Sequence, residues 1–259
     1  MSLLSRLDDA VLPALGNAMA RLGRGARRMR MFTVGAGVLA AVVTFVAVYA
    51  ATRAPVAGDP TIGDVLRVGV SDGDSIPAYV ASTKQRLAAL PDGTEVYALV
   101  SFTAYLAPDR LPAALGSVSL SSVFARVPLP GVQTELIRLG AYNVPDDVIA
   151  GMDATAARKE DEAANYRKTV QKATDVPEDI RQVYASDADV ATAEATAYRQ
   201  HCSCVYAAVV HAAPAALRAL AQRPEVRAVD PASEVKRLDR TVFLPPLPEQ
   251  ADRVRPVGN

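Results

Sequence analysis

The chain has 259 residues, 50% of them hydrophobic, and its 28 basic residues balance 28 acidic ones. This length suits one principal domain with accessory segments better than two full domains. The absence of net charge argues against a nucleic-acid partner. The lack of Trp, with only 5% aromatic residues, gives no sign of a stacking platform for bases or sugars.

The first segment, residues 1–30, combines an apolar stripe with a basic end. Its apolar residues recur at spacings of three and four, which predicts an amphipathic helix that lies on a membrane face or pairs with a partner helix. Five arginines follow that stripe: Arg21, Arg24, Arg27, Arg28 and Arg30. The pattern is typical of a basic juxtamembrane segment.

Residues 31–52 read MFTVGAGVLAAVVTFVAVYAAT and carry no charge. At about 1.5 Å per residue, a helix of this length spans the ~30 Å hydrocarbon core of a bilayer, so we expect a transmembrane helix. The arginines before this helix predict that residues 1–30 lie in the cytoplasm. The chain would then be a single-pass protein of the cell membrane, with residues 53–259 outside the cell. A cleaved signal peptide, with Val48-Tyr49-Ala50 as the cleavage site, is the alternative, although its basic and apolar regions would be unusually long.

After a short linker at residues 53–61, the sequence predicts one extracytoplasmic domain over residues 62–235. Two stretches in it, VYALVSF at 96–102 and VYAAVVH at 205–211, share Val-Tyr-Ala-x-Val. Each precedes a helical and then a β-rich stretch, so the pattern is βαβ twice. Two such right-handed units fold most readily into a four-stranded antiparallel sheet with both helices on one face. We therefore expect an α+β, ferredoxin-like fold.

The second unit also resembles a known family. In VYAAVVHAAPAALRALAQRPEVRAVDPASEV, an apolar strand, a helix ending near PEV and a strand ending in an acidic-Pro pair follow one another. This order is similar to the C-terminal βαβ unit of subtilisin propeptides, the I9 inhibitor-like family. The positions that carry the resemblance are Leu217, Leu220, Pro224, Glu225, Val226, Val229, Asp230 and Pro231. It implies a propeptide-like fold and, as an activity, protease inhibition or chaperoning.

As a whole, the chain resembles single-pass membrane proteins of actinobacterial type, a likeness that implies no particular function. Residues 144–200 separate the two βαβ units. Their periodicity predicts one helix from about Pro145 to Ala173 and a second that runs back after TDVPED, which makes a helical hairpin. The charge run RKEDEA within it is expected to be a solvated face. The hairpin offers a surface for a protein partner, and packing over the sheet is the alternative.

Two further stretches flank these elements. Before the insertion, residues 128–139 contain a Pro-Gly turn and then alternating residues, which predicts a further hairpin strand that extends the sheet. Residues 236–259 form a Pro-rich C-terminal tail with the phrase LPPLPEQ, which favours extended chain. The neighbouring apolar residues Val242, Phe243 and Leu244 favour wrapping around the domain over a free polyproline ligand.

The phrase HCSC at residues 201–204 holds both cysteines and one of the two histidines. A metal site is not expected, because zinc takes three or four converging ligands and Cys204 lies far from His211 along one strand. The oxidising side of the membrane favours a structural disulfide between Cys202 and Cys204, at the junction of the insertion and the second strand. Thiol-redox chemistry by the same pair is the alternative, although the usual CxxC motif is absent.

No nucleophile motif, phosphate-binding loop or paired histidines indicates an enzyme, so no catalytic residue and no cofactor is predicted. We expect a membrane-anchored, extracytoplasmic protein-binding module without enzymatic activity, whose protein partner the sequence does not identify. Two alternatives remain. The first is a propeptide-like protease inhibitor or chaperone, and the second is a thiol-redox protein that uses Cys202 and Cys204.

Overall fold

The computed structural model describes residues 65–172 and 177–255, which belong to one compact unit, Asp64–Asn259. The predicted cytoplasmic segment, transmembrane helix and linker lie outside these residues. Within the described ranges, no helix is both long and apolar enough to cross a membrane. The predicted fold is corrected accordingly, because what the described residues form is an α+β domain without a membrane-spanning helix.

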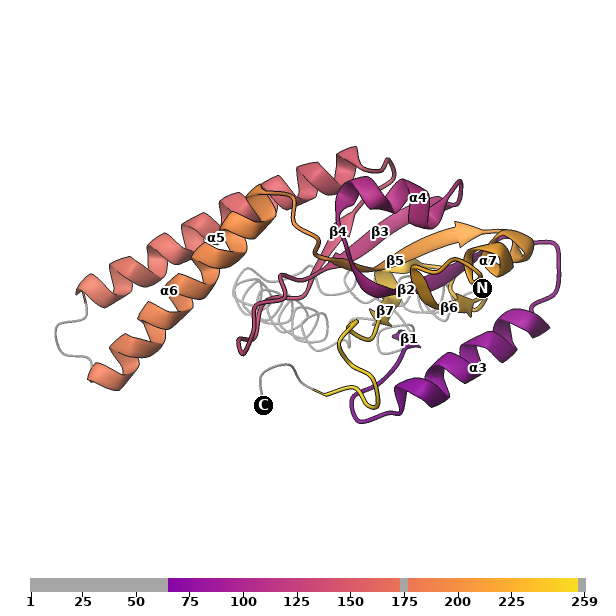
Figure 1. The fold of residues 1–259 in the computed structure, drawn as a ribbon, viewed down its shortest axis with the longest axis horizontal. Helices are drawn as coiled ribbons and strands as arrows, with labels where there is room; N and C mark the ends of the chain where they lie inside the picture. The colour runs from indigo at the N-terminus through magenta and orange to yellow at the C-terminus, as the bar shows by residue number, and fades with distance from the viewer. Residues whose placement is uncertain (1–64, 173–176, 256–259) are drawn as a thin grey trace, which may run out of the picture. The chain divides into compact units, whose positions relative to one another are not determined.

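A five-stranded antiparallel sheet forms the centre of this domain (Figure 1). Its strands, in spatial order, are β4 (Ile137–Gly140), β3 (Ser119–Ala125), β5 (Val205–Ala212), β2 (Val96–Leu106) and β6 (Val226–Ala232). The strands β2 and β5, which contain the shared Val-Tyr-Ala-x-Val, pair directly with Val100 opposite Ala208. Their near-continuous apolar runs suit positions that are covered on both faces, and both of these side chains are fully buried.

The sheet differs from the predicted four-stranded, ferredoxin-like one. The strand that was expected from residues 128–139 to extend the sheet is β4, which lies at the edge beside β3. A separate parallel pair, which was not expected, joins β1 (Leu66–Gly69) to β7 (Thr241–Leu244). The alternation before β4 predicted a longer strand, but pairing begins only at Ile137. The reason is that Thr134 is buried and its hydroxyl accepts a hydrogen bond from Arg126 Nε at 2.9 Å, which holds this stretch out of the ladder.

Short helices cover one face of the sheet. The strand β2 leads into η1 (Pro108–Arg110) and α4 (Leu111–Leu115), and β5 leads into α7 (Pro214–Leu220). Each has a proline in its first turn, where the missing N–H removes no helical hydrogen bond. The larger hydrophobic core joins the leucines of α4 and α7 to the start of the long helix α5 (Asp146–Lys172). Its members include Leu111, Leu115, Leu217, Leu220, Val148 and Met152.

The opposite face is covered by β1, β7 and the C-terminal tail. Phe243 and Leu247 are buried there against Leu99 and Tyr206 of the sheet. Arg227 on β6 donates hydrogen bonds to two backbone oxygens of the tail, at 2.7 and 3.3 Å. The described part of the tail therefore wraps around the domain, as predicted, and is not a free polyproline ligand.

The helix α3 (Ile76–Ala89) packs against β6, the outer strand of the sheet. Asp230 is completely buried at this contact. Its carboxylate accepts a hydrogen bond from the Tyr79 hydroxyl at 3.1 Å and pairs with Arg86 at 2.9 Å. Burial raises the pKa of the Asp230 carboxyl, and the charge of Arg86 and the hydrogen bond from Tyr79 offset part of this rise. Asp230, the acidic residue of the acidic-Pro pair, therefore fixes α3 to the sheet.

Candidate functional site

The helices α5 (Asp146–Lys172) and α6 (Glu178–Arg199) fill the insertion between β4 and β5. Both begin with acidic residues and end with a basic one, which suits the helix dipole. The Asp147 carboxylate fixes the start of α5, because it accepts hydrogen bonds from the backbone N–H groups of Tyr142 (2.7 Å) and Asn143 (2.8 Å). These hydrogen bonds hold the pKa of the Asp147 carboxyl below its usual value.

The two helices pack against each other as an antiparallel hairpin, which extends away from the sheet (Figure 1). The buried residues of the two helices include five alanines, which let the two backbones approach closely: Ala156, Ala163, Ala188, Ala191 and Ala195. Toward the tip, the rings of Tyr166 and Tyr184 lie with their centroids 6.1 Å apart. The start of α5 packs into the larger core through Val148 and Met152, and beyond this base the hairpin projects from the sheet (Figure 1).

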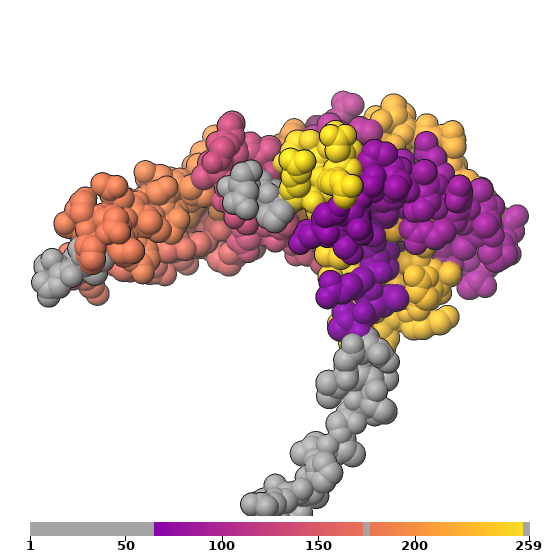
Figure 2. Space-filling view, turned by 90° about the horizontal axis from the view of Figure 1, so that it is seen from below, coloured from indigo at the N-terminus to yellow at the C-terminus, as the bar shows by residue number. Residues whose placement is uncertain are grey.

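The outer part of the hairpin, residues 164–172 and 177–187, is called the distal arm below. The last buried side chain of α5 is Ala163 and the first of α6 is Ala188, so none of the described side chains of the distal arm is buried. Ile180 and Val183, one turn apart on α6, are exposed at 42% and 54%. Figure 2 shows the hairpin standing clear of the sheet-bearing part of the domain. The distal arm therefore relies on packing between its own two helices.

An ion-pair cluster locks the base of the hairpin. The Lys159 side chain is only 5% exposed, and its Nζ lies within 3.0 Å of three carboxylates, those of Glu135 (2.9 Å), Glu162 (3.0 Å) and Glu194 (2.9 Å). Glu194 is 2% exposed and also accepts a hydrogen bond from the backbone N–H of Glu135 at 2.9 Å. The cluster joins α5, α6 and the segment that leads into β4.

The charges of this cluster stabilise one another. Burial by itself lowers the pKa of the Lys159 ammonium, but its hydrogen bonds to the three carboxylates outweigh burial, and the pKa lies above its usual value. Burial likewise raises the pKa of the Glu135 carboxyl, but hydrogen bonds from Lys159 and Arg158 overcome this effect and lower it. The lysine and Glu135 are therefore both charged at neutral pH.

The charge run RKEDEA was predicted to be a solvated face, and this prediction is wrong for the buried Lys159. The signal that identifies it is its spacing, since Lys159 follows Ala156 by three residues and precedes Ala163 by four. That spacing places it on the buried stripe of α5. A lysine on such a stripe needs carboxylate partners, because an unpaired buried charge is costly.

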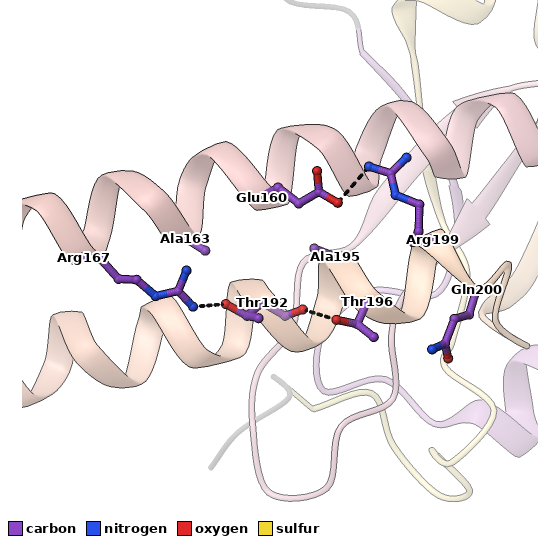
Figure 3. Close-up of a pocket in the computed structure, with 8 residues that line it drawn as sticks. All are labelled: Glu160, Ala163, Arg167, Thr192, Ala195, Thr196, Arg199 and Gln200. Atoms are coloured by element: carbon purple, nitrogen blue, oxygen red, sulfur yellow. Dashed lines mark hydrogen bonds and ion pairs between the residues drawn. The ribbon is translucent and has the colours of Figure 1, made fainter.

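A groove of about 270 Å³ runs between α5 and α6 on another side of the hairpin (Figure 3). This hairpin groove is lined by Glu160, Ala163, Arg167, Thr192, Ala195, Thr196, Arg199 and Gln200. Two contacts across it tie the helices together. The Arg199 guanidinium pairs with Glu160 at 2.8 Å, and Arg167 donates a hydrogen bond to the Thr192 hydroxyl at 2.6 Å. Ala163 and Ala195 form the floor of the groove and are themselves buried between the two helices.

Residues 201–204, with the sequence HCSC, form the turn between α6 and β5. Cys202 and Cys204 form a disulfide with Cα atoms 5.3 Å apart, and Cys204 is completely buried. His201 has a φ of 51°, in the left-handed region that few residues other than glycine adopt. Its Nε2 lies 3.1 Å from Oδ1 of Asp153 on α5. The turn thereby connects both helices of the hairpin to the start of β5.

The second histidine lies elsewhere. His211, near the end of β5, has its Nδ1 3.3 Å from Glu95 and its ring centroid 4.6 Å from that of Tyr97. The structure therefore does not bring His201 and His211 together. Across the two described stretches, no three or more His, Cys, Asp or Glu side chains are grouped so as to hold a metal ion.

Comparisons of the chain with models of known families, with curated proteins and with solved structures found no match. They lend no support to the resemblance between residues 205–235 and subtilisin propeptides, and the structure shows no likeness to such a propeptide. What the geometry defines is an α+β domain that carries a projecting helical hairpin with a locked base.

Proposed function

We propose that the chain is a non-enzymatic protein-binding module and that the distal arm is the surface through which it binds. One observation carries this proposal: the arm projects from the domain, buries none of its described side chains and exposes Ile180 and Val183 on one side of α6. Helices in water gain most of their stability from packing of an apolar face. A protein partner that covers this apolar pair supplies the packing that the domain does not.

The base of the hairpin supports the same function. The Lys159 cluster joins both helices to the segment before β4, and the turn at His201 joins them to β5. Such anchoring holds the arm in one direction before a partner arrives. Binding then loses less conformational freedom than it would with a flexible arm, and the affinity rises accordingly.

A photo-crosslinking residue at Val183 tests the proposal in cells that make the full chain. The matched control is the same residue at Val242, which is exposed at 40% on β7. We expect adducts of defined mass from position 183 and none of the same mass from position 242. Equal adduct patterns at the two positions, or none at position 183, would refute the distal arm as the binding surface.

A shortened hairpin provides the second test. Because the Tyr166 ring contacts the Tyr184 ring and Lys159 pairs with Glu194 across the antiparallel hairpin, Ala163 lies level with about Ala188. Replacing residues 164–187 with a short Gly-rich turn therefore removes the distal arm without separating the remaining helices. We expect this variant to unfold cooperatively near the temperature of the wild type and to lose the partner. A variant that folds and keeps the partner would contradict the proposal.

A further inference from the structure

The strand β4 forms one edge of the five-stranded sheet, beside β3 (Figure 1). Its side chains alternate, with Ile137 and Leu139 buried and Arg138 and Gly140 exposed. The buried pair faces the start of α5, where Gly151 lies against the Leu139 side chain. The strand at the other edge, β6, packs against α3. Among the described residues, no strand pairs with the outer side of β4, so this edge of the sheet is open.

The register of β4 shows which of its backbone groups point outward. In an antiparallel ladder, hydrogen-bonded and non-hydrogen-bonded pairs alternate along the strand. The ladder continues to Ala141, whose N–H donates to the Ser121 carbonyl at 3.3 Å. Leu139, two residues earlier, therefore also bonds toward β3, and the N–H and C=O groups of Arg138 and Gly140 point away from it. These groups are the donors and acceptors that an added strand uses.

The exposed side chains along this edge determine what an added strand must carry. Leu136 and Tyr142, which precede and follow the ladder at alternate positions, are exposed at 56% and 77%. Between them, the Arg138 guanidinium donates to the Ser122 hydroxyl at 2.9 Å, and no ion pair of Arg138 is found within the described residues. Gly140 has open space where a side chain would lie. In chain order, the edge presents an apolar, a cationic, an empty and an apolar position.

We propose that the open edge of β4 binds an extended peptide segment of a partner protein, which pairs antiparallel with β4 and adds a strand to the sheet. The strands of the sheet already pair antiparallel, and this pairing is slightly more stable per residue than the parallel one. The segment carries an acidic residue opposite Arg138 and apolar residues opposite Leu136 and Tyr142, because such directly opposed pairs stabilise a ladder. Opposite Gly140 it carries an aromatic ring, which covers the place of the missing side chain.

A second copy of the chain fits this edge less well. Two copies of β4 can pair with Arg138 opposite Arg138 or with Arg138 opposite Gly140, and the two guanidinium groups are then directly or diagonally opposed. Like charges in such positions destabilise the pairing. A further shift sets Arg138 opposite Tyr142, whose N–H already donates to the Asp147 carboxylate at 2.7 Å. A segment with one acidic residue avoids both problems.

This inference does not rest on the distal arm, since β4 belongs to the sheet and the distal arm begins at residue 164. The two surfaces therefore fail separately. Adducts at position 183 without peptide binding at β4 would refute this inference and leave the proposed function standing. Peptide binding at β4 without adducts at position 183 would do the opposite.

Fluorescence anisotropy of a labelled heptapeptide tests the edge with the purified full chain. The probe, Val-Thr-Phe-Thr-Glu-Thr-Val, sets its Glu opposite Arg138 and its Phe opposite Gly140. With about four hydrogen bonds and about three side-chain pairs, we expect a dissociation constant on the order of 100 µM. N-methylation of the Glu removes an N–H that points to β4, so binding should weaken about tenfold. N-methylation of the central Thr, opposite Leu139, is the control, because that N–H points away from β4.

Charge reversal tests the same contact from the side of the protein. Arg138→Glu sets like charges opposite each other, so the probe should bind about fivefold more weakly. A probe with Lys in place of Glu should bind this variant as tightly as the first probe binds the wild type. Arg110→Glu is the matched control, because it makes the same charge change at an exposed arginine of η1. Thermal unfolding at an unchanged temperature shows that each variant is folded, and the two N-methylated probes, measured on the wild type, need no variant.

Four results would each overturn the proposal. The first is no saturable binding of the probe up to about 1 mM. The second is an equal loss of affinity for the two N-methylated probes. The third is a loss with Arg110→Glu as large as that with Arg138→Glu, without recovery by the Lys probe. The fourth is a wild type that dimerises and excludes the probe, which would identify a second copy as the occupant of the edge.

Discussion

Replacing Lys159 with Met tests whether the buried cluster holds the base of the hairpin. Met has a similar length and no charge, so it fills the space and removes the ammonium. The Glu194 carboxylate, 2% exposed, then loses the cation that lies 2.9 Å from it and stays beside two other carboxylates. Leaving one charge of an ion pair buried without its partner strongly destabilises the fold.

The expected magnitude follows from the burial of each partner. Removing one member of a buried ion pair costs about 3–5 kcal/mol. The lower end applies, because Glu135 and Glu162 are 38% and 33% exposed and can turn toward water. We therefore expect the free energy of unfolding to fall by about 3 kcal/mol at pH 7. Adding Glu194→Gln removes the stranded charge and keeps an oxygen that accepts from the Glu135 N–H, so about half of the loss should return.

Urea unfolding followed by circular dichroism measures these differences. The control is Lys168→Met on the exposed side of α5, which should change the free energy of unfolding by less than about 0.5 kcal/mol. The pKa of the folded Glu135 carboxyl is lowered, so its contribution to stability is present above the ordinary carboxyl pKa and is lost as the pH falls through the folded value. The gap between wild type and Lys159→Met should therefore narrow in acid. A Lys159→Met loss no larger than that of the control would refute the role of the cluster.

Two more substitutions test contacts in the domain. Tyr79→Phe removes the hydroxyl that donates to buried Asp230, and we expect the free energy of unfolding to fall by about 1.5–3 kcal/mol. The control, Tyr142→Phe at a 77% exposed side chain, should change little, and equal losses would contradict the buried contact. Replacing Cys202 and Cys204 with Ala opens a three-residue loop, whose closure entropy predicts a loss of about 1.6 kcal/mol. A thermal unfolding temperature unchanged in both this variant and the reduced wild type would contradict that stabilisation.

The sequence identifies strands whose signal is local, but it does not identify the partner of a strand when that partner lies far away along the chain. The repeated Val-Tyr-Ala-x-Val marks β2 and β5, because a continuous run of apolar and β-branched residues suits a strand covered on both faces. The pairing of β1 with β7 joins Leu66 to Thr241, and no local pattern specifies a partner at that distance. The late start of β4 has a similar cause, since it depends on the contact of buried Thr134 with Arg126.

In the candidate site, too, the sequence predicts local features and does not predict contacts between distant segments. Periodicity predicts both helices of the hairpin, and pairing of the only two cysteines predicts the bond at the end of α6. The buried state of Lys159 was missed, because a run of mixed charges was weighed by composition and not by its position on the helix. Two of its three carboxylates lie on α6 and on the segment before β4. Because these segments are distant in sequence, the local pattern around Lys159 does not identify them as its partners.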